Sequence, residues 1–314
     1  MAPSVSFSDF AADVRAGLTK AGQKELYSKY LYDALGTSLF EAITHLPEYG
    51  LTRADTRLLT AHAADIAAMF DDPALITEFG SGTGQKTRII LDTFTAIPRY
   101  YPIDVSAKAL AACEDALADL ANVYPIPATY LEGLAQVTAA RRQHDPLLVL
   151  FLGSTIGNFE RNCAREFLAE VRDRLQPGDG FLLGADLIKP TAQLLAAYDD
   201  PTGVTAAFNR NLLGRINREL GGNFDLRFFD HEARYEESER RIEMHLRSTI
   251  DQTATVPGAG ITVEFRKGET IWTESSYKFK PEELDELAAA TGFDVRATWI
   301  DQEWPFAETL WIAA

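Results

Sequence analysis

The chain has 314 residues, of which 46% are hydrophobic and 24% are charged, as in a globular protein with one large domain or two smaller ones. Its formal net charge of −16 argues against nucleic acid as a partner, because a phosphate backbone attracts a basic surface that this chain lacks overall. A local basic groove is still compatible with this composition.

The sequence carries no signal for a membrane or a metal centre. Residues 1–8 lack a basic segment followed by an apolar core, and no apolar run reaches the roughly 20 residues that span a bilayer, so we expect a cytoplasmic protein. Cys113 and Cys163 lie far apart without a C-x-x-C pattern, which indicates neither a disulfide framework nor a zinc site. The histidines form no H-E-x-x-H motif, so no metal is expected, although the many carboxylates are compatible with an oxygen-ligand metal. They are His45, His62, His144, His231 and His245.

The first half of the chain reads as helices followed by an α/β domain. Apolar residues recur at helical spacing from Phe10 to about Phe70, interrupted at 47–50, which predicts two or three helices. From there to about Lys189, short apolar runs alternate with helical windows, and this alternation predicts a parallel, doubly wound sheet. These runs lie at 75–79, 99–103, 147–152 and 180–184.

The second half adds an insertion and then closes the sheet. Helical spacing returns between 191 and 219, and alternation predicts strands over 232–250 and 262–280. A helix over 281–291 follows, and two strands near 293–301 and 308–313 are expected to end the sheet as an antiparallel hairpin.

The most informative segment follows the first predicted strand. Residues 78–87 read Glu-Phe-Gly-Ser-Gly-Thr-Gly-Gln-Lys-Thr, with glycines at alternate positions before a helical window. Glycine admits positive φ and a close approach of backbone to ligand, and the start of a helix offers unpaired N–H groups. The spacing matches neither a phosphate-binding loop nor the dinucleotide fingerprint. The segment fits a cofactor with an amino-acid tail, although such turns also occur without a ligand.

Asp104 ends the second predicted strand, about 20 residues after the glycines. A carboxylate at that position can accept hydrogen bonds from both hydroxyl groups of a ribose. The alternative is a structural role, in which Asp104 or Ser106 caps a helix that begins near Ala107. The distance from the glycine loop favours the ligand.

A third candidate follows the run 147–152. The residues from Gly153 to Asn158 read Gly-Ser-Thr-Ile-Gly-Asn and lie at the edge of the sheet where open α/β folds bind ligands. Small residues admit a ligand and Asn158 adds an amide. The alternative is that Asn158 caps the following helix.

In these segments and several others the chain resembles the histidine-specific N-alpha-methyltransferases, which use S-adenosylmethionine and form hercynine in ergothioneine biosynthesis. The resemblance covers nearly the whole chain, and several separated matches in order are more specific than a glycine loop. The matching segments are Pro47-Glu48-Tyr49, 78–87, 153–158, Ala197-Tyr198-Asp199-Asp200, 205–211, Ile242-Glu243-Met244 and Thr273-Glu274-Ser275-Ser276.

The resemblance implies an α/β fold with two parts. One is a Rossmann-like class I methyltransferase domain that binds S-adenosylmethionine, expected over 61–190 and 279–314. The other is a substrate-binding domain formed by the N-terminal helices and the central insertion, expected over 1–60 and 191–278. A monomer acting on the small molecule L-histidine, with no nucleic acid or membrane partner, is expected.

The resemblance also assigns residues to the amino-acid substrate. Asn158 and Tyr198 match the family's clamp on the α-carboxylate, and an amide with a phenol can bind a carboxylate without a full positive charge. Tyr32 and Tyr49 match tyrosines that line the pocket, and Tyr32 is the candidate proton acceptor. Taken singly, both tyrosines would more often be half-buried packing residues.

Three further residues are implied for the imidazole ring. Glu274 and Ser276 match the pair that recognises the ring, and Met244 matches a residue that packs against it. Alternation along a strand would put Glu274 and Ser276 on one face. A carboxylate bonded to an imidazole N–H selects for histidine, because an apolar side chain would leave the carboxylate unpaired.

The cofactor residues implied by the resemblance lie in the glycine loop and after the two strands that follow it. The chain departs from the family pattern at Glu132, where most members have an aspartate for the adenine amino group. It departs again at Gly50 and Leu51, where many members have a tyrosine and a proline. The implied residues are Glu78, Gly80, Ser81, Gly82, Lys86, Asp104, Glu132 and Gly133.

The expected reaction is repeated methyl transfer from S-adenosylmethionine to the α-amine of L-histidine, ending in the trimethylammonium betaine. One alternative is a methyltransferase of the same family acting on another amino acid such as tryptophan, which Met244 with Glu274 disfavours. A second alternative is a protein that binds S-adenosylmethionine without catalysis.

Overall fold

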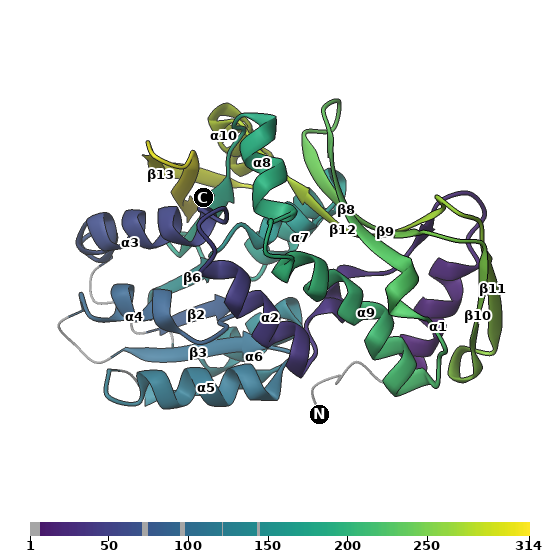
Figure 1. Cartoon of the computed structure of the whole chain (residues 1–314). Helices are drawn as coiled ribbons and strands as arrows, with labels where there is room; N and C mark the ends of the chain where they lie inside the picture. Colours follow the sequence, from purple (N-terminus) through teal and green to yellow (C-terminus); the bar gives the residue numbers. More distant parts are fainter. Residues whose placement is uncertain (1–6, 71–74, 95–97, 121, 143–144) are drawn as a thin grey trace. The chain divides into compact units, whose positions relative to one another are not determined.

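The computed structural model describes residues 7–70, 75–94, 98–120, 122–142 and 145–314 (Figure 1). The segment 1–6, on which the expectation about targeting depends, and His144 lie outside the described residues. Contacts divide the described chain into two compact units, the first covering Leu51–Ile188 and Lys278–Ala314 and the second covering 7–50 and 189–277. The assignment of cofactor and substrate to separate domains stays a prediction.

The first unit contains a mixed sheet in the order β13-β14-β7-β6-β2-β3-β4, with β5 beside β3. Strand β14 is antiparallel to β7 and β13, and the remaining pairs are parallel. The predicted parallel sheet with a closing antiparallel hairpin is therefore confirmed. The strands are β2 (Leu75–Phe79), β3 (Arg99–Asp104), β4 (Asn122–Val123), β5 (Ile126–Pro127), β6 (Leu147–Phe151), β7 (Gly180–Asp186), β13 (Phe293–Asp301) and β14 (Phe306–Ala313).

The helices of this unit follow from the strand order. From β2 the chain runs outward through β3 to β4, and it then returns to β6 on the other side of β2. Because crossovers between parallel strands are right-handed, α4 and α5 cover one face and α6 and α7 the other. The carboxyl ends of β2 and β6 therefore form the switch point where such sheets bind ligands. The helices are α3 (Leu51–Ala67), α4 (Gln85–Leu91), α5 (Ala107–Leu117), α6 (Tyr130–Ala140), α7 (Arg161–Arg172) and α10 (Pro281–Ala290).

The two faces of this sheet bury different side chains. One face presents aliphatic residues, including Ile76 of β2 and Leu150 of β6, to a core that contains Leu59 of α3. The other face presents Phe79 and Phe151, whose ring centroids lie 5.6 Å apart. Since side chains alternate along a strand, neighbouring residues of β2 and β6 serve opposite faces.

The second unit is built around a smaller sheet in the order β1-β12-β9-β8, against which α9 packs (Figure 1). The helices predicted for 191–219 and the strands predicted for 232–250 are confirmed, whereas 262–280 forms two strands that belong to different sheets, and the strand over 252–256 was not predicted. Strand β1 was not predicted, because two residues carry no readable pattern. The elements are α1 (Phe7–Leu18), β1 (Lys24–Glu25), η1 (Ser28–Leu31), α2 (Ala34–Thr44), α8 (Thr191–Tyr198), α9 (Val204–Leu220), η3 (Leu226–Phe228), β8 (Phe229–Glu236), β9 (Arg241–Ser248), β10 (Gln252–Val256), η4 (Pro257–Ala259), β11 (Ile261–Phe265) and β12 (Thr270–Tyr277).

A β-bulge in β12 sets which side chains face α9. Trp272 pairs with His245 and Glu274 pairs with Met244, so Thr273 is an extra residue between them. The bulge reverses the alternation, and Glu274 therefore points to the face opposite Trp272. Beyond the bulge the register is regular, so Glu274 and Ser276 share one face, as alternation predicts.

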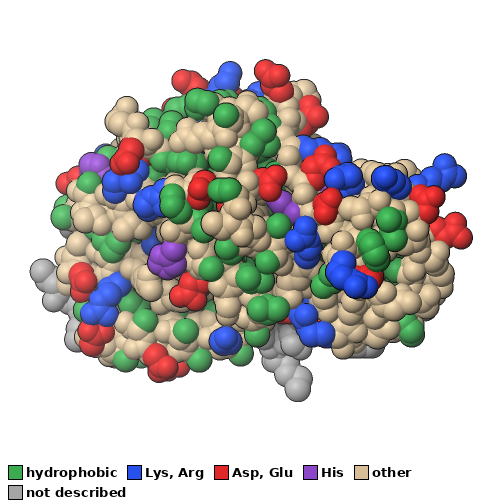
Figure 2. Space-filling model, in the orientation of Figure 1, with side chains coloured by type: hydrophobic (Ala, Val, Ile, Leu, Met, Phe, Trp, Pro, Cys, Tyr) green, Lys and Arg blue, Asp and Glu red, His purple; other side chains and the backbone are tan. Residues whose placement is uncertain are grey.

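On its surface the protein mixes positive and negative side chains, and its helices are of ordinary length. On the face drawn in Figure 2, lysine and arginine side chains are interspersed with aspartate and glutamate. Among the residues that the structure describes, no helix is both long and apolar enough to cross a membrane. Nor do three or more His, Cys, Asp or Glu side chains of the described chain gather in a way that could hold a metal ion.

Candidate active site

The glycine loop joins β2 to α4 through left-handed backbone. Gly80, Gly82 and Gly84 have φ values of +74°, +52° and +73°. A Cβ on Gly80 would lie 3.2 Å from the Tyr130 hydroxyl, and one on Gly84 would lie 2.9 Å from a methyl carbon of Leu117. Any other residue would therefore be strained at these positions and crowded at two of them. Gly80 and Gly82 are exposed, and their contact with a ligand stays a prediction.

Asp104 lies at the carboxyl end of β3 beside this loop. Its Oδ1 accepts a hydrogen bond from the Ser106 N–H at 2.8 Å. Burial raises the pKa of the Asp104 carboxyl, and N–H groups that include that of Gly82 oppose the shift. The cap of α5 is Ser106, whose Oγ accepts from the Ala109 N–H at 3.3 Å. Asp104 is thus not needed as the side-chain cap and faces the glycine loop.

Lys86 connects the loop after β2 to the turn after β6. Its Nζ lies 2.7 Å from Oδ2 of Asp55 on α3, and the same oxygen accepts from the Gly153 N–H at 3.1 Å. Burial alone would lower the pKa of Lys86, but the charge and hydrogen bond of Asp55, with smaller contributions from Glu78 and Glu308, together raise it. The ammonium stays charged and half-buried.

Glu78 lies beneath the loop, with only 2% of its surface exposed. Its carboxylate accepts hydrogen bonds from the Thr87 hydroxyl and, at 2.5 Å, from the Tyr100 hydroxyl. Burial raises the pKa of Glu78 to about 7 despite these donors. Glu78 therefore ties β2 to α4 and β3, and direct contact with a cofactor stays a prediction.

Glu132 and Gly133 lie in the first turn of α6. The exposed Glu132 carboxylate accepts from the N–H and hydroxyl of Thr129 in a capping box. A Cβ on Gly133 would lie 2.5 Å from the Ile103 side chain, so Gly133 allows α6 to pack closely on β3. These are local structural roles, and cofactor contacts of both residues stay predictions.

Tyr130 is a residue of this region that sequence reasoning missed. Its ring stacks on Phe79 with centroids 5.2 Å apart, and its hydroxyl lies against Gly80. Nothing in the sequence around Tyr130 distinguishes it from an ordinary packing residue.

Asn158 ends the short helix η2 (Thr155–Asn158), which follows a sharp turn. In that turn Gly153 and Ser154 both have positive φ, and the Ser154 Oγ accepts from the Asp186 N–H at 2.9 Å. A left-handed serine is uncommon and often marks a functional turn. Helix α7 begins at Arg161 with Glu160 as its cap residue, so the alternative of Asn158 as a cap is wrong.

The second unit brings together the residues predicted for an amino-acid side chain. Tyr198, at the end of α8, donates a hydrogen bond from its hydroxyl to Oγ of Ser276 at 2.7 Å. Met244, paired with Glu274 across β9 and β12, is buried, and Glu274 is 9% exposed. A carboxylate, two hydroxyls and a thioether therefore share one face of the small sheet.

Aromatic rings continue from this group. Tyr49 contacts Tyr198 edge-on, with ring centroids 6.3 Å apart. Phe40 contacts both Tyr49 and Tyr32, at 6.3 Å and 5.5 Å. Phe208 of α9 completes the contact with Tyr32. The three tyrosines predicted for the substrate therefore belong to one aromatic cluster.

His231 contacts the backbone of Tyr198. Sequence reasoning missed this residue. Its Nε2 lies 2.7 Å from the Tyr198 carbonyl oxygen, and its Nδ1 lies 2.9 Å from the Asn209 amide nitrogen. Burial lowers the pKa of His231, so the ring is neutral. The amide of Asn209 donates to Nδ1, and Nε2–H donates to the carbonyl. No motif in the sequence marks His231, because its partners come from two distant helices.

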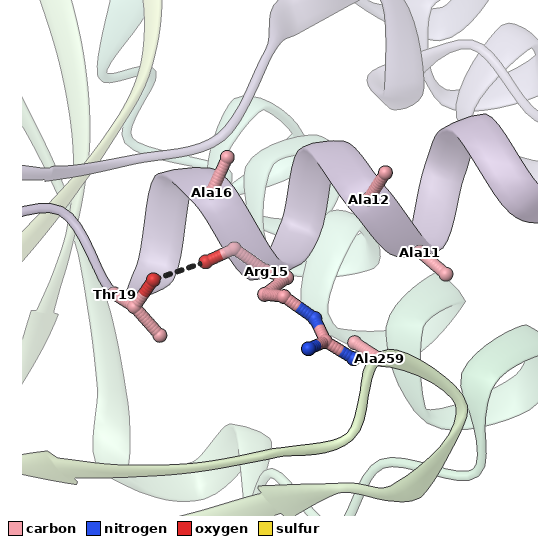
Figure 3. Close-up of a pocket in the computed structure, with 6 residues that line it drawn as sticks. All are labelled: Ala11, Ala12, Arg15, Ala16, Thr19 and Ala259. Atoms are coloured by element: carbon pink, nitrogen blue, oxygen red, sulfur yellow. Dashed lines mark hydrogen bonds between the residues drawn. The ribbon is translucent and has the colours of Figure 1, made fainter.

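A pocket elsewhere in the second unit holds none of these residues. It has a volume of about 430 Å³ and lies between α1 and η4 (Figure 3). Four of its six lining residues are alanines, and Arg15 and Thr19 bond locally, the Thr19 hydroxyl donating to the Arg15 carbonyl oxygen at 2.7 Å. The pocket offers no group suited to catalysis.

Comparison with known proteins matches nearly the whole chain. The profile of a family described as "Histidine-specific methyltransferase, SAM-dependent" matches residues 10–313. Histidine N-alpha-methyltransferases from Mycolicibacterium smegmatis and Mycobacterium tuberculosis are 42% and 41% identical, with 95% of this chain and 93% of each relative covered. Ergothioneine biosynthesis protein 1 of Neurospora crassa is 31% identical over 89% of this chain, which corresponds to 32% of that longer protein.

Proposed function

We propose that this chain, which belongs to the family of S-adenosylmethionine-dependent histidine-specific methyltransferases, methylates the α-amine of L-histidine to form hercynine. One observation carries the choice of histidine. Glu274 and Ser276 lie on one face of β12 opposite Met244, with the Tyr198 hydroxyl on Ser276. This group suits a flat ring that has polar N–H edges.

The nearly buried carboxylate of Glu274 is what selects the ring. It can accept a hydrogen bond from an imidazole N–H, while Met244 packs against the ring face. An apolar side chain in the same place would leave the carboxylate unpaired, and a site built on such a bond rejects analogues without it by roughly 10⁴. An indole is larger and would have to displace Met244, so tryptophan is disfavoured.

The first unit fits the cofactor. S-adenosylmethionine supplies the methyl group as an already reactive sulfonium. The positive-φ glycines let the backbone approach it, Asp104 accepts hydrogen bonds from the ribose, and Lys86 pairs with the carboxylate of the amino-acid tail. The retained substrate residues, Glu274, Ser276 and Tyr198, support catalysis over cofactor binding alone.

The protein must also remove a proton and tolerate a growing positive charge. An ammonium has no lone pair, so the substrate amine must be neutral before each transfer. In this proposal Tyr32, as its phenolate, accepts the proton directly or through water and becomes a neutral phenol. The rings of Tyr32 and Tyr49 then stabilise the methylated ammonium by cation–π attraction, worth about 0.5 to 2 kcal/mol per ring.

Some assignments rest on the family resemblance alone. Asn158 belongs to the first unit, so its contact with the same carboxylate as Tyr198 stays a prediction. The addition of three methyl groups, a monomeric state and a cytoplasmic location also stay predictions.

Product analysis tests this proposal. Purified protein is incubated with S-adenosylmethionine and equal amounts of histidine and tryptophan, and the products are read by mass spectrometry. We expect histidine to gain three methyl groups, and Glu274→Ala to lower kcat/KM for histidine at least roughly 100-fold. Glu264→Ala, at an exposed position of β11, is the matched control. Methylated tryptophan, or no product from either amino acid, would contradict the proposal.

A further inference from the structure

Three ionisable side chains meet in the first unit beneath the glycine loop, and the reaction does not use two of them. Asp55 of α3 and Glu308 of β14 are 0% and 1% exposed, and Lys86 of α4 lies beside Asp55. Two carboxylates in one buried place are unfavourable when both are ionised. Some interaction must therefore stabilise Asp55 and Glu308 in this buried place.

If both acids are ionised, this cluster has more hydrogen-bond acceptors than donors. Asp55 Oδ2 receives donors from Lys86 and Gly153. Asp55 Oδ1 and both carboxylate oxygens of Glu308 are buried and receive no donor from the described residues. One proton on Glu308 turns an acceptor into a donor, and Glu308 is placed to bond Asp55. A shared proton thus pairs the two acids.

The sheet makes room for this pair. Glu308 faces Gly184 across the β14–β7 ladder, and a Cβ on Gly184 would lie 2.8 Å from Glu308 Oε1. A Cβ on Gly153 would lie 2.9 Å from the Lys86 Nζ. Glycine at both positions leaves the space that the carboxyl and the ammonium occupy. The cluster is therefore part of how β6, β7 and β14 pack.

We propose that Asp55 and Glu308 share one proton and together position Lys86, so that the lysine can bind the carboxylate of the cofactor's amino-acid tail. The cluster then holds one negative and one positive charge. With both acids ionised it would carry a net negative charge and repel that carboxylate. The positioning of Lys86 for the cofactor rests on the cofactor role proposed above, whereas the shared proton does not.

The electrostatics of the surrounding elements agree with this assignment. Burial raises the pKa of Glu308 well above its usual range, the charge of Asp55 adds to the effect, and Lys86 opposes it. Glu78 of β2 is the other charged group that acts on Lys86, and its own pKa is about 7. A pH profile must therefore separate Glu308 from Glu78.

Infrared spectroscopy of the protein without cofactor tests the shared proton. The carbonyl stretch of a protonated carboxylic acid should persist above about pH 8, where Glu78 is ionised, and should disappear in Glu308→Gln. Asp55→Asn should shift the band, because the group that accepts the Glu308 proton changes from a carboxylate to an amide. Glu286→Gln, on the exposed side of α10, should leave the band unchanged. A wild-type protein without the band would overturn the inference even if no variant folds.

Calorimetric titration with S-adenosylhomocysteine tests the positioning of Lys86. Glu308→Gln keeps a donor toward Asp55 and cannot ionise, so its affinity at about pH 7 should stay within about threefold of wild type. As the pH is raised until Glu308 loses its proton, wild-type affinity should fall roughly tenfold, and this fall should be smaller in the variant. Equal pH profiles would overturn the positioning role. Lys86→Ala with unchanged affinity would instead refute the proposed cofactor role of Lys86.

Discussion

The two units support their candidate residues by different physical means. In the first unit, buried ionisable groups hold the cofactor loop: Glu78 bonds Thr87 and Tyr100 beneath it, and Asp55 bonds Lys86 beside it. In the second unit, neutral groups hold the substrate residues. Tyr198 is fixed by the Ser276 hydroxyl and by the backbone contact to neutral His231.

This difference predicts different sensitivities. Buried acids change charge with pH, so the cofactor loop should respond to titration. The hydroxyls, aromatic rings and neutral imidazole around Tyr198 keep their charge state at neutral pH, so Tyr198 should respond to loss of single hydrogen bonds and Glu274 to strand register. Variants in each unit can therefore separate the two kinds of support.

The largest effect is expected for Glu78→Gln on the pH dependence of stability. The folded pKa of Glu78 is about 7 against an ordinary value of 4.5. Its contribution is therefore fully present below pH 4.5 and is lost as pH rises through 7. The shift corresponds to at most about 3 kcal/mol of unfolding free energy. Glutamine stays neutral, so this component should vanish.

Urea unfolding at several pH values measures this pH-dependent contribution of Glu78 to the unfolding free energy. The difference between wild type and Glu78→Gln should change across that window, while Glu114→Gln, at an exposed position of α5, should follow wild type. Parallel stability curves for wild type and Glu78→Gln would mean that the pKa of Glu78 is the same in the folded and the unfolded protein.

The second-largest effect is expected for Asp104→Ala, which should weaken cofactor binding. Each hydrogen bond to a charged acceptor contributes at least about 1.5 kcal/mol, so the loss of two should raise the Kd of S-adenosylhomocysteine at least roughly 100-fold. Asp115→Ala, an exposed aspartate of α5, is the matched control. Calorimetry decides the matter, and an unchanged Kd would leave Asp104 with only its bonds to the loop.

The first unit could be predicted closely because its information is local. The glycines, Lys86 and Asp104 lie in short contiguous segments whose spacing specifies strand, turn and helix. The support beneath the loop could not be predicted. Asp55 and Glu308 come from α3 and β14, more than 200 positions apart, and only the completed sheet brings them together.

The second unit shows the opposite limit. Its strands follow from alternation, but the bulge at Thr273 has no signature in the sequence, and it decides which face Glu274 occupies. The family resemblance named Glu274 and Tyr198, whereas His231 became visible only through its contacts with Tyr198 and Asn209.

Tyr198→Phe should have a smaller effect, confined to the substrate. The variant keeps the ring beside Tyr49 and loses the hydroxyl that bonds Ser276. KM for histidine should rise roughly tenfold, about 1.4 kcal/mol, while the Kd of S-adenosylhomocysteine stays unchanged. Tyr27→Phe, at a tyrosine that is 45% exposed, should change neither value. Equal losses of substrate and cofactor affinity would break the separation between the two units.

Thr273→Val should have the smallest effect and tests register directly. The Thr273 hydroxyl donates to the Met244 carbonyl oxygen at 2.9 Å across the bulge, and valine has the same shape without that donor. Loss of one buried hydrogen bond should lower the unfolding free energy by about 1 kcal/mol. KM for histidine should rise about threefold because Glu274 is less firmly oriented, whereas Thr262→Val on exposed β11 should leave KM unchanged. A stability loss without any rise in KM would show that neighbouring strand pairs fix Glu274 and that the bulge bond only contributes to folding.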